Sequence, residues 1–513
     1  MNGRTGSFFG TVLGRVTMYR LVTLSLGTLA IYAFVLSLFG QVFYKPLELL
    51  ATLATLLVVG YLTNRLFGAL FQVQPHSESS VITSLLLFFI LWPTSEPTAL
   101  AWIALAATVA SASKYLLAIR GRHVLNPAAI AALVMSVLAS YVTLPGVSPS
   151  VWWVANPWLL PGVVILGGLV LIRTKRLTMA LVFIVLSWAL VTVRLVTGGQ
   201  ELGPALLAPL TSYPILFLAA FMLTEPLTLP PRRWQQLAEA AIVAALFSIP
   251  FTLGQVASTP ELALIVGNVL AFIVARRRGM RLTLEGTRAL TPTAVEYQFS
   301  SKRSIPFAAG QYLELSLPHR GADVRGSRRV FSISSPPDDD RTIRVAMRVP
   351  ERASSFKRAL NALPVGASLS ATGVWGDFVL PKDTSKPILL LAAGIGITPF
   401  VSQLSRLHLR ADQRDVVLVY VVSDPQELAY AAELETWGTP VLVVGPTDDV
   451  RLPDGWRGLG PGRLDHERLA EAVPDLAERE VFISGPPAMI EALKPALRGI
   501  GVGHVRTDAF SGY

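Results

Sequence analysis

The sequence predicts an all-α, membrane-embedded first half, followed by a small antiparallel β-barrel and then an α/β domain built on a parallel sheet. The 513-residue chain has a mean hydropathy of +0.52 and only 15% charged residues, which is too apolar for a protein that lies wholly in water. Apolar runs of helix length fill residues 1–276, and short β-rich runs separated by turns fill 280–382. In 385–513, strand-like runs alternate with helical ones.

Composition excludes several kinds of site. The chain has no cysteine, so thiolate-bound iron–sulfur clusters, cysteine zinc sites, disulfides and a cysteine nucleophile are excluded. The net charge of +10 could suggest nucleic acid, but the basic residues gather at the ends of apolar runs, which is typical of membrane topology. We therefore expect a lipid bilayer and no nucleic acid as partner. A redox centre would be an organic cofactor or a histidine-bound metal, and we assign no residue to a metal.

Ten apolar windows approach the roughly 20 residues that a helix needs to cross a bilayer. The third is short and ends at Trp92-Pro93, like a broken helix. With the N-terminus inside, inner segments hold fourteen Lys and Arg residues, and outer ones hold two, Lys45 and Arg194. This predicts a multi-pass protein of the cell membrane with both termini and the C-terminal half in the cytoplasm. The windows are 18–42, 46–71, 79–93, 98–119, 126–144, 157–173, 177–197, 203–224, 233–254 and 259–276.

A shift of the chain on itself by 133 residues predicts an internal repeat. The shift lays Phe88-Phe89-Ile90 on Phe221-Met222-Leu223 and Asn126-Pro127 on Thr259-Pro260, so windows one to five fall on windows six to ten. Because five is odd, the second copy would enter from the opposite side. Such inverted repeats often hold a site at their interface near the bilayer midplane.

Two proline-broken segments at matching places in the repeats are the candidate membrane site. They carry Glu96 and Glu225, and Lys114 and Asn126 accompany them. Each residue also has a purely structural interpretation. The glutamates can be interfacial charges at helix ends, Lys114 can extend its ammonium to the cytoplasmic edge, and Asn126 can cap a helix that starts at Pro127.

The stretches Asn126-Pro-Ala-Ala129 and Thr224-Glu-Pro-Leu-Thr-Leu-Pro230 resemble motifs of one family of membrane proteins, over about 260 residues. Its members are NqrB of the sodium-pumping NADH:quinone reductase and RnfD of the Rnf electron-transport complex. That family binds FMN covalently through a Ser/Thr-Gly-Ala-Thr motif, which is absent from the connection 144–157 here. The resemblance therefore implies noncovalent FMN, a quinone or neither in the membrane half.

The second half carries motifs that suit nucleotide phosphates. Gly394-Ile-Gly-Ile-Thr-Pro399 and Ser484-Gly-Pro-Pro487 each follow a buried strand, where glycine lets the backbone approach a pyrophosphate, although any tight turn also needs glycine. Arg329-Val-Phe-Ser332 and Ser354-Ser355 supply a guanidinium fork and hydroxyl groups that match phosphate oxygens.

Taken in chain order, from Arg329 through Ser354 to Gly394 and Ser484, the motifs resemble the ferredoxin–NADP reductase superfamily, over about 230 residues. The resemblance implies that FAD binds the barrel and that NADH or NADPH binds the α/β domain. Arg329 would meet the FAD pyrophosphate, Phe331 beside Val330 would pack on the flavin in place of the usual tyrosine, and Ser332 would lie near flavin N5. Ser354 and Ser355 would form the second phosphate loop.

On the nicotinamide side, Ser484 stands where the superfamily usually has cysteine. We expect it to be catalytic together with Ser332 and Asp508. By the same resemblance, the nicotinamide nucleotide would contact Gly394, Gly396, Thr398, Pro399, Gly485, Pro486 and Met489.

Two further expectations concern Asp424 and the last residues of the chain. A carboxylate at Asp424 could accept from a ribose 2′-hydroxyl and repel a 2′-phosphate, which favours NADH over NADPH, or it could simply start a turn. Asp508, Phe510 and Tyr513 resemble the acidic and aromatic residues that cover the flavin in the superfamily, and a frayed tail is the alternative.

These motifs predict a membrane-bound oxidoreductase that passes electrons from NADH or NADPH through FAD to a quinone or second flavin in the membrane half, with further electron-transfer subunits as candidate partners. One alternative, a transmembrane haem reductase, needs stacked histidine pairs, and only His76 and His123 precede residue 280. The other is a transporter or channel with a redox-sensing FAD/NAD module. A sensor has no need of the hydride path that Arg329–Ser332 and the glycine motifs provide.

Overall fold

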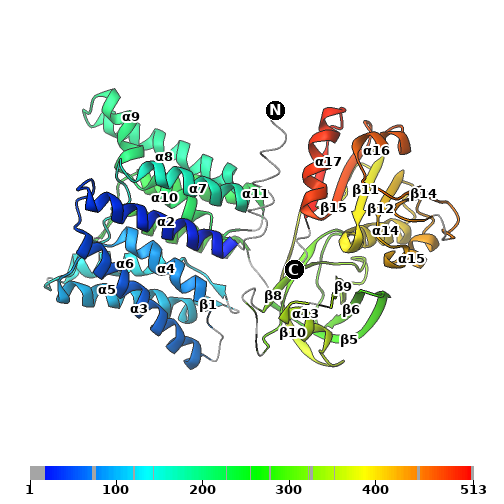
Figure 1. Cartoon of the computed structure of the whole chain (residues 1–513), viewed down its shortest axis with the longest axis horizontal. Helices are drawn as coiled ribbons and strands as arrows, with labels where there is room; N and C mark the ends of the chain where they lie inside the picture. The colour runs from blue at the N-terminus through cyan, green and yellow to red at the C-terminus, as the bar shows by residue number, and fades with distance from the viewer. Residues whose placement is uncertain are drawn as a thin grey trace. The chain divides into compact units, whose positions relative to one another are not determined.

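The computed structural model describes residues 18–71, 75, 77–119, 122–142, 144–226, 228–230, 232–254, 256–275, 279–319, 321, 323, 327–351, 353–447 and 451–509. The chain divides into two compact units, Met1–Arg276 and Arg277–Tyr513 (Figure 1). The prediction that Arg276 to Arg278 form a basic inner segment, and the predictions for Phe510 and Tyr513, lie outside the described residues.

The first unit is helical, and within the described residues a helix lies in each of the ten predicted windows. By length and composition α2, α3, α5 and α8 could cross a membrane, and α9 with residues 215–223 is a fifth candidate, bent by 42°. The number of ten spans stays a prediction. The helices are α2 Met18–Leu38, α3 Pro46–Leu70, α4 Ser77–Ile90, α5 Pro97–Leu116, α6 Pro127–Tyr141, α7 Leu160–Thr174, α8 Leu177–Thr197, α9 Leu202–Thr211, α10 Ile215–Leu218, the π-helical η1 Ala219–Leu223, α11 Arg233–Ser248 and α12 Pro260–Ala275.

Helix α4 ends early, at Ile90, and a loop from elsewhere in the unit bonds its last carbonyl groups. The backbone N–H groups of Val151 and Trp152 both donate to the Ile90 carbonyl, at 2.8 and 2.9 Å. The Trp153 indole N–H donates to the carbonyl of Phe88. The break in the helix leaves these backbone carbonyls without helical hydrogen-bond partners, and N–H groups of the protein take their place. Such pairing is required in an apolar environment, where no water can supply the hydrogen bonds.

The two halves of the helical unit pack in corresponding ways. α3 packs on α5 as α8 packs on α11, and α5 packs on α6 as α11 packs on α12. A short hairpin precedes α6 (β1 Ala118–Ile119 and β2 Arg122–His123), and another precedes α12 (β3 Thr252–Leu253 and β4 Val256–Ala257). Across the halves, α2 contacts α7 and α6 contacts α12. These correspondences support the inverted repeat, which remains a proposal.

The second unit begins with an antiparallel sheet, as predicted. Its strand order is β8-β7-β10-β5-β6-β9, and an isolated bridge between Ile333 and Val345 joins the end of β8 to β9. Alternate side chains such as Leu282, Tyr297 and Leu313 fill its interior. The elements are β5 Gly279–Thr291, β6 Ala294–Ser301, β7 Tyr312–Ser316, β8 Arg328–Ser332, β9 Thr342–Arg348, α13 Ser355–Asn361 and β10 Ser368–Trp375.

A parallel sheet follows, with the order β14-β13-β12-β11-β15-β16. Successive residues of β11 enter the hydrophobic cores on opposite faces of the sheet, which explains why this strand is apolar throughout. The α/β architecture predicted for this region is confirmed. The elements are β11 Ile388–Ala393, η2 Gly394–Ile397, α14 Thr398–Leu409, β12 Val416–Val421, η3 Pro425–Glu427, α15 Ala431–Thr436, β13 Val441–Val444, β14 Trp456–Gly460, α16 His466–Ala472, β15 Glu480–Gly485, α17 Pro487–Gly499 and β16 Val505–Ala509.

Candidate active site

The two glycine motifs meet at the carboxyl ends of β11 and β15. These neighbouring strands are where the strand order reverses, the place at which open parallel sheets bind ligands. A Cβ at Gly396 would stand 2.5 Å from the carbonyl oxygen of Ser484, and one at Gly485 would stand 3.0 Å from Ala393 Cβ. Glycine is therefore required at Gly396 because a side chain would push the two strands apart.

The three predicted catalytic residues come together at this edge. Ser484 lies opposite Asp508 in the register of β15 and β16, and the Ser332 hydroxyl donates to Asp508 Oδ2 at 3.4 Å. The Ser484 hydroxyl is fully buried and has no hydrogen-bond partner among the described residues. Burial raises the pKa of Asp508 to about 6, against the lowering effect of the Ser332 hydrogen bond, and the charge of Asp377 raises it further. The folded protein therefore holds a proton on Asp508 at pH values up to about 6.

The residues around Ser332 on β8 differ in exposure. Phe331 is buried in the barrel core, and its ring centroid lies 6.0 Å from that of Phe356. Val330 points the other way and is 54% exposed. The Arg329 guanidinium lies 5.3 Å from the centre of the Phe356 ring. Phe356 thus supports both the predicted phosphate-binding arginine and the predicted flavin-packing aromatic.

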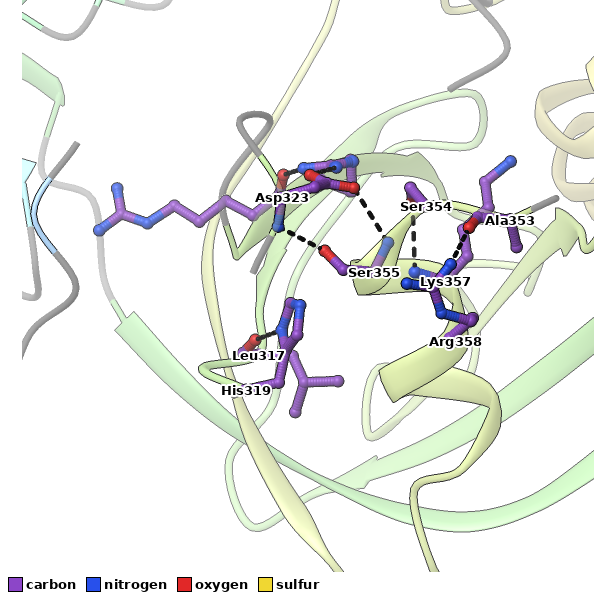
Figure 2. A network of polar contacts seen from close by, with 10 residues as sticks. Leu317, His319, Asp323, Ala353, Ser354, Ser355, Lys357 and Arg358 are labelled. Atoms are coloured by element: carbon purple, nitrogen blue, oxygen red, sulfur yellow. Dashed lines mark hydrogen bonds and ion pairs between the residues drawn. The ribbon is translucent and has the colours of Figure 1, made fainter. Parts of the chain in front are cut away.

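The predicted phosphate-binding groups form one network with a residue that sequence reasoning missed (Figure 2). The backbone N–H of Ser355 donates to Asp323 Oδ2 at 3.0 Å, and the N–H of Asp323 donates to the Ser355 hydroxyl at 2.9 Å. Arg329 lies 3.6 Å from Asp323 Oδ1. The Ser354 hydroxyl caps α13 by accepting from Lys357 N–H. No sequence signal marks Asp323, because it belongs to the connection between β7 and β8.

Asp424 starts a turn, as its structural interpretation predicts. Its exposed side chain accepts from the backbone N–H of Gln426 at 2.9 Å and caps η3. The loop that it opens is fastened to the barrel. Glu427 accepts from the Thr293 hydroxyl, and the Tyr430 hydroxyl donates to Glu296 at 2.7 Å. The carboxylate remains at the end of β12, the position that suits a ribose contact.

In the helical unit, a cavity gathers part of the predicted membrane site. Asn126 caps α6 and also donates through Nδ2 to Glu225 Oε2 at 2.8 Å, and both residues line the cavity. Lys114 donates to the carbonyl of Ser79, another lining residue, at 2.9 Å. Glu96 does not line the cavity and is exposed. Apolar side chains from both halves, such as Leu86 and Phe221, complete the lining.

Comparison with known proteins identifies the second unit. Residues 390–494 match the family model described as an oxidoreductase NAD-binding domain. The chain is 30% identical to the heme-dependent oxidative N-demethylase beta subunit of Ectopseudomonas mendocina, over 41% of this chain and 78% of that protein. It is 27% identical to the stachydrine N-demethylase reductase subunit Stc4 of Rhizobium meliloti, over 41% of this chain and 60% of that protein.

The chain belongs to the ferredoxin–NADP reductase family. Its C-terminal half is a ferredoxin–NADP reductase-type FAD- and NAD-binding unit, as the motifs predict. Among solved structures, the Amycolatopsis cytochrome P450 reductase GcoB is 25% identical, with a TM-score of 0.39, over 46% of this chain and 70% of that one. The chain spans 60% and 57% of the lengths of Stc4 and of the Escherichia coli NADH oxidoreductase HCR.

The glycine crevice and the Ser332–Asp508 pair both belong to this FAD- and NAD-binding unit. These groups lie together at the carboxyl ends of β11, β15 and β16. That a nicotinamide and a flavin meet beside them remains a proposal. The donors around Arg329, Ser354 and Ser355 have the chemistry that a pyrophosphate requires, so the residues present fit FAD. The relatives named above match about two fifths of the chain, and the resemblance of the helical unit to NqrB and RnfD remains a proposal.

Proposed function

We propose that this protein is a membrane-bound NADH oxidoreductase in which electrons leave FAD for a quinone, or for a noncovalent flavin, in the cavity of the helical unit. One observation carries the proposal. Ser332, from the barrel, meets Asp508, 176 residues later, beside the two glycine turns of the parallel sheet. In this arrangement, the hydroxyl that would face the flavin and a carboxyl that can hold a proton lie beside the crevice that would accept a dinucleotide.

Each residue has a definite task in the proposed reaction. FAD, when bound, accepts a hydride and can release electrons singly. The Ser332 hydroxyl donates its only proton to Asp508 Oδ2, which leaves its oxygen to accept a hydrogen bond from the crevice, and a proton held by Asp508 belongs on the other carboxyl oxygen, Oδ1. Arg329 and the second phosphate loop bind the pyrophosphate of FAD. Gly396 and Gly485 keep the crevice open for the nicotinamide nucleotide. Asp424 favours NADH over NADPH by repelling a 2′-phosphate.

The cavity of the helical unit suits a ring with polar edges. Phe221 and Leu86 offer apolar surface, and the pair Asn126–Glu225 offers a donor and an acceptor. Its lining comes from both halves of the unit, the interface at which an inverted repeat would hold a ligand. These features support a quinone or a flavin ring as the acceptor. The bilayer, the ten spans and the cytoplasmic position of both termini belong to the same proposal, supported by the apolar helices.

The test compares two glutamates of the helical unit in detergent-purified full-length protein. Glu225→Gln should lower quinone-dependent NADH oxidation by about tenfold, because it changes the cavity, while the rate of flavin reduction by NADH stays unchanged. Glu96→Gln is the matched control, since Glu96 is exposed and outside the cavity. Equal activities of the two variants would contradict the acceptor site. Purified protein without flavin would overturn the whole proposal.

A further inference from the structure

The Asp323 carboxylate contacts the same hydrogen-bond donors, Ser355 N–H and Arg329, that would bind FAD in the proposed function. The Ser355 N–H, one arm of the second phosphate loop, points at Asp323 Oδ2 from 3.0 Å (Figure 2). The Asp323 N–H returns a hydrogen bond to the Ser355 hydroxyl at 2.9 Å. On its other side, Asp323 Oδ1 lies 3.6 Å from the Arg329 guanidinium. One carboxylate therefore contacts both groups that would bind phosphate oxygens.

A carboxylate and a phosphate compete for such donors because both are anionic oxygen acceptors for N–H groups. A single backbone N–H makes one good hydrogen bond, so the Ser355 N–H donates to one anion at a time. A negative charge beside Arg329 also opposes the approach of a pyrophosphate. The Asp323 contact therefore competes with phosphate binding, and it also anchors the loop.

The arginine is the fixed partner of this pair, and the aspartate is the one able to leave. Arg329 has a 12% exposed side chain, which packs over the Phe356 ring and donates to the carbonyl of Arg328. The Asp323 side chain is 32% exposed and belongs to the connection between β7 and β8. Displacing the carboxylate moves a loop side chain towards solvent and leaves the buried donors in place for a second anion.

We infer that Asp323 acts as an internal anion that FAD must displace from Arg329 and Ser355, so that this residue sets the affinity for the cofactor. The inference rests on the proposed function, which assigns these two groups to the FAD pyrophosphate. Binding is then an exchange of one anion for another. The aspartate lowers affinity for any ligand that carries a diphosphate, and it does so through charge and through occupation of the Ser355 N–H.

The experiment measures the Kd of FAD for the full-length protein in detergent, after removal of bound flavin, by quenching of flavin fluorescence. Asp323→Asn keeps the size of the side chain but removes the charge, and should tighten FAD about tenfold, which corresponds to about 1.4 kcal/mol. Asp323→Glu keeps the charge and should stay near wild type. Asp454→Asn, at an exposed aspartate of the same unit, controls for net charge and should also bind like wild type.

Inorganic pyrophosphate provides a second measurement. It should compete with FAD more effectively in Asp323→Asn than in the wild type, because the same donors become available to it. Unchanged or weaker FAD binding by a folded Asp323→Asn variant would overturn the inference and make Asp323 a residue that only positions the loop. If the wild-type protein binds no FAD at all, the proposed function itself fails, and the two failures are thus distinguishable.

Discussion

At the scale of single residues, the protonation of Asp508 links the candidate site to pH. Its carboxyl is largely enclosed, and it accepts from the neutral hydroxyl of Ser332 at 3.4 Å. An environment of this kind favours the protonated acid over the carboxylate, so the pKa rises from 3.8 to about 6. A carboxyl that titrates near the working pH is suited to holding or donating a proton.

The raised pKa predicts that Asp508 makes stability depend on pH. The folded protein keeps a proton on Asp508 that the unfolded chain, with an ordinary pKa of 3.8, has already released. Its contribution to stability is thus fully present below 3.8 and is lost as pH rises through about 6. Asp508→Asn should be more stable than wild type above pH of about 7, on the order of 1 kcal/mol, and lose this advantage near pH 4. Thermal unfolding across this pH range checks the difference, and a constant gap at every pH would contradict it.

Asp424 predicts the choice between the two nicotinamide nucleotides. Asp424→Asn keeps the oxygen that accepts from Gln426 N–H, so the turn should persist, while the charge that would repel a 2′-phosphate is lost. We expect kcat/KM for NADPH to rise about tenfold and that for NADH to change by less than about threefold. Steady-state kinetics with both nucleotides measure the ratio. An unaltered ratio would leave Asp424 with its capping role alone.

At the scale of elements, the site depends on strands that end side by side. Between β11 and β15, Gly396 lies so close to the Ser484 carbonyl that there is no room for a Cβ. Buried polar contacts also join the α/β domain to the barrel. Glu296 accepts from Tyr430 and from Ser334, and it pairs with Arg288 at 3.1 Å. The loop after β12 therefore has a defined position relative to β8, which carries Ser332.

The crowding at Gly396 predicts the effect of one methyl group. Gly396→Ala should lower kcat/KM for NADH by about 10- to 100-fold, because the ends of β11 and β15 must separate, while FAD content remains at the wild-type level. Gly438→Ala is the matched control, at a glycine outside the crevice. A Cβ at Gly438 meets nothing within 4 Å, and its positive φ of 65° imposes only backbone strain of about 1 kcal/mol. Similar kinetics for the two variants would show that the close approach to Ser484 is unimportant.

At the scale of the whole molecule, an apolar helical unit and a nucleotide-binding unit share one chain. Among the described residues of the first unit, four helices are long and apolar enough to cross a membrane. Exposed Leu, Ile and Val side chains such as Ile31, Leu62 and Val193 are frequent on their surfaces. In water such a surface would drive association. Surrounded by lipid, the same side chains are stable, which agrees with the proposed membrane location.

The proposed insertion into a membrane predicts how the full-length protein behaves in fractionation. The full chain should remain in the membrane fraction after an alkaline carbonate wash and be released by detergent, since several apolar helices would hold it in the hydrocarbon core. Fractionation followed by detection of the protein in pellet and supernatant measures this. Release by the wash alone would contradict membrane insertion, although it would leave the FAD/NAD unit unaffected.

Local sequence patterns determined much of this protein. Apolar windows predicted the helices, and the glycine turns after buried strands predicted the parallel sheet and the crevice around Gly396 and Gly485, because periodicity and turn chemistry act over a few residues. Only the tertiary structure decided which distant groups meet. Ser332 reaches Asp508, Asp323 reaches Arg329 and Ser355, and Asn126 reaches Glu225 because strand order, loop paths and helix packing are set by the burial of whole elements, a long-range effect that no local pattern encodes.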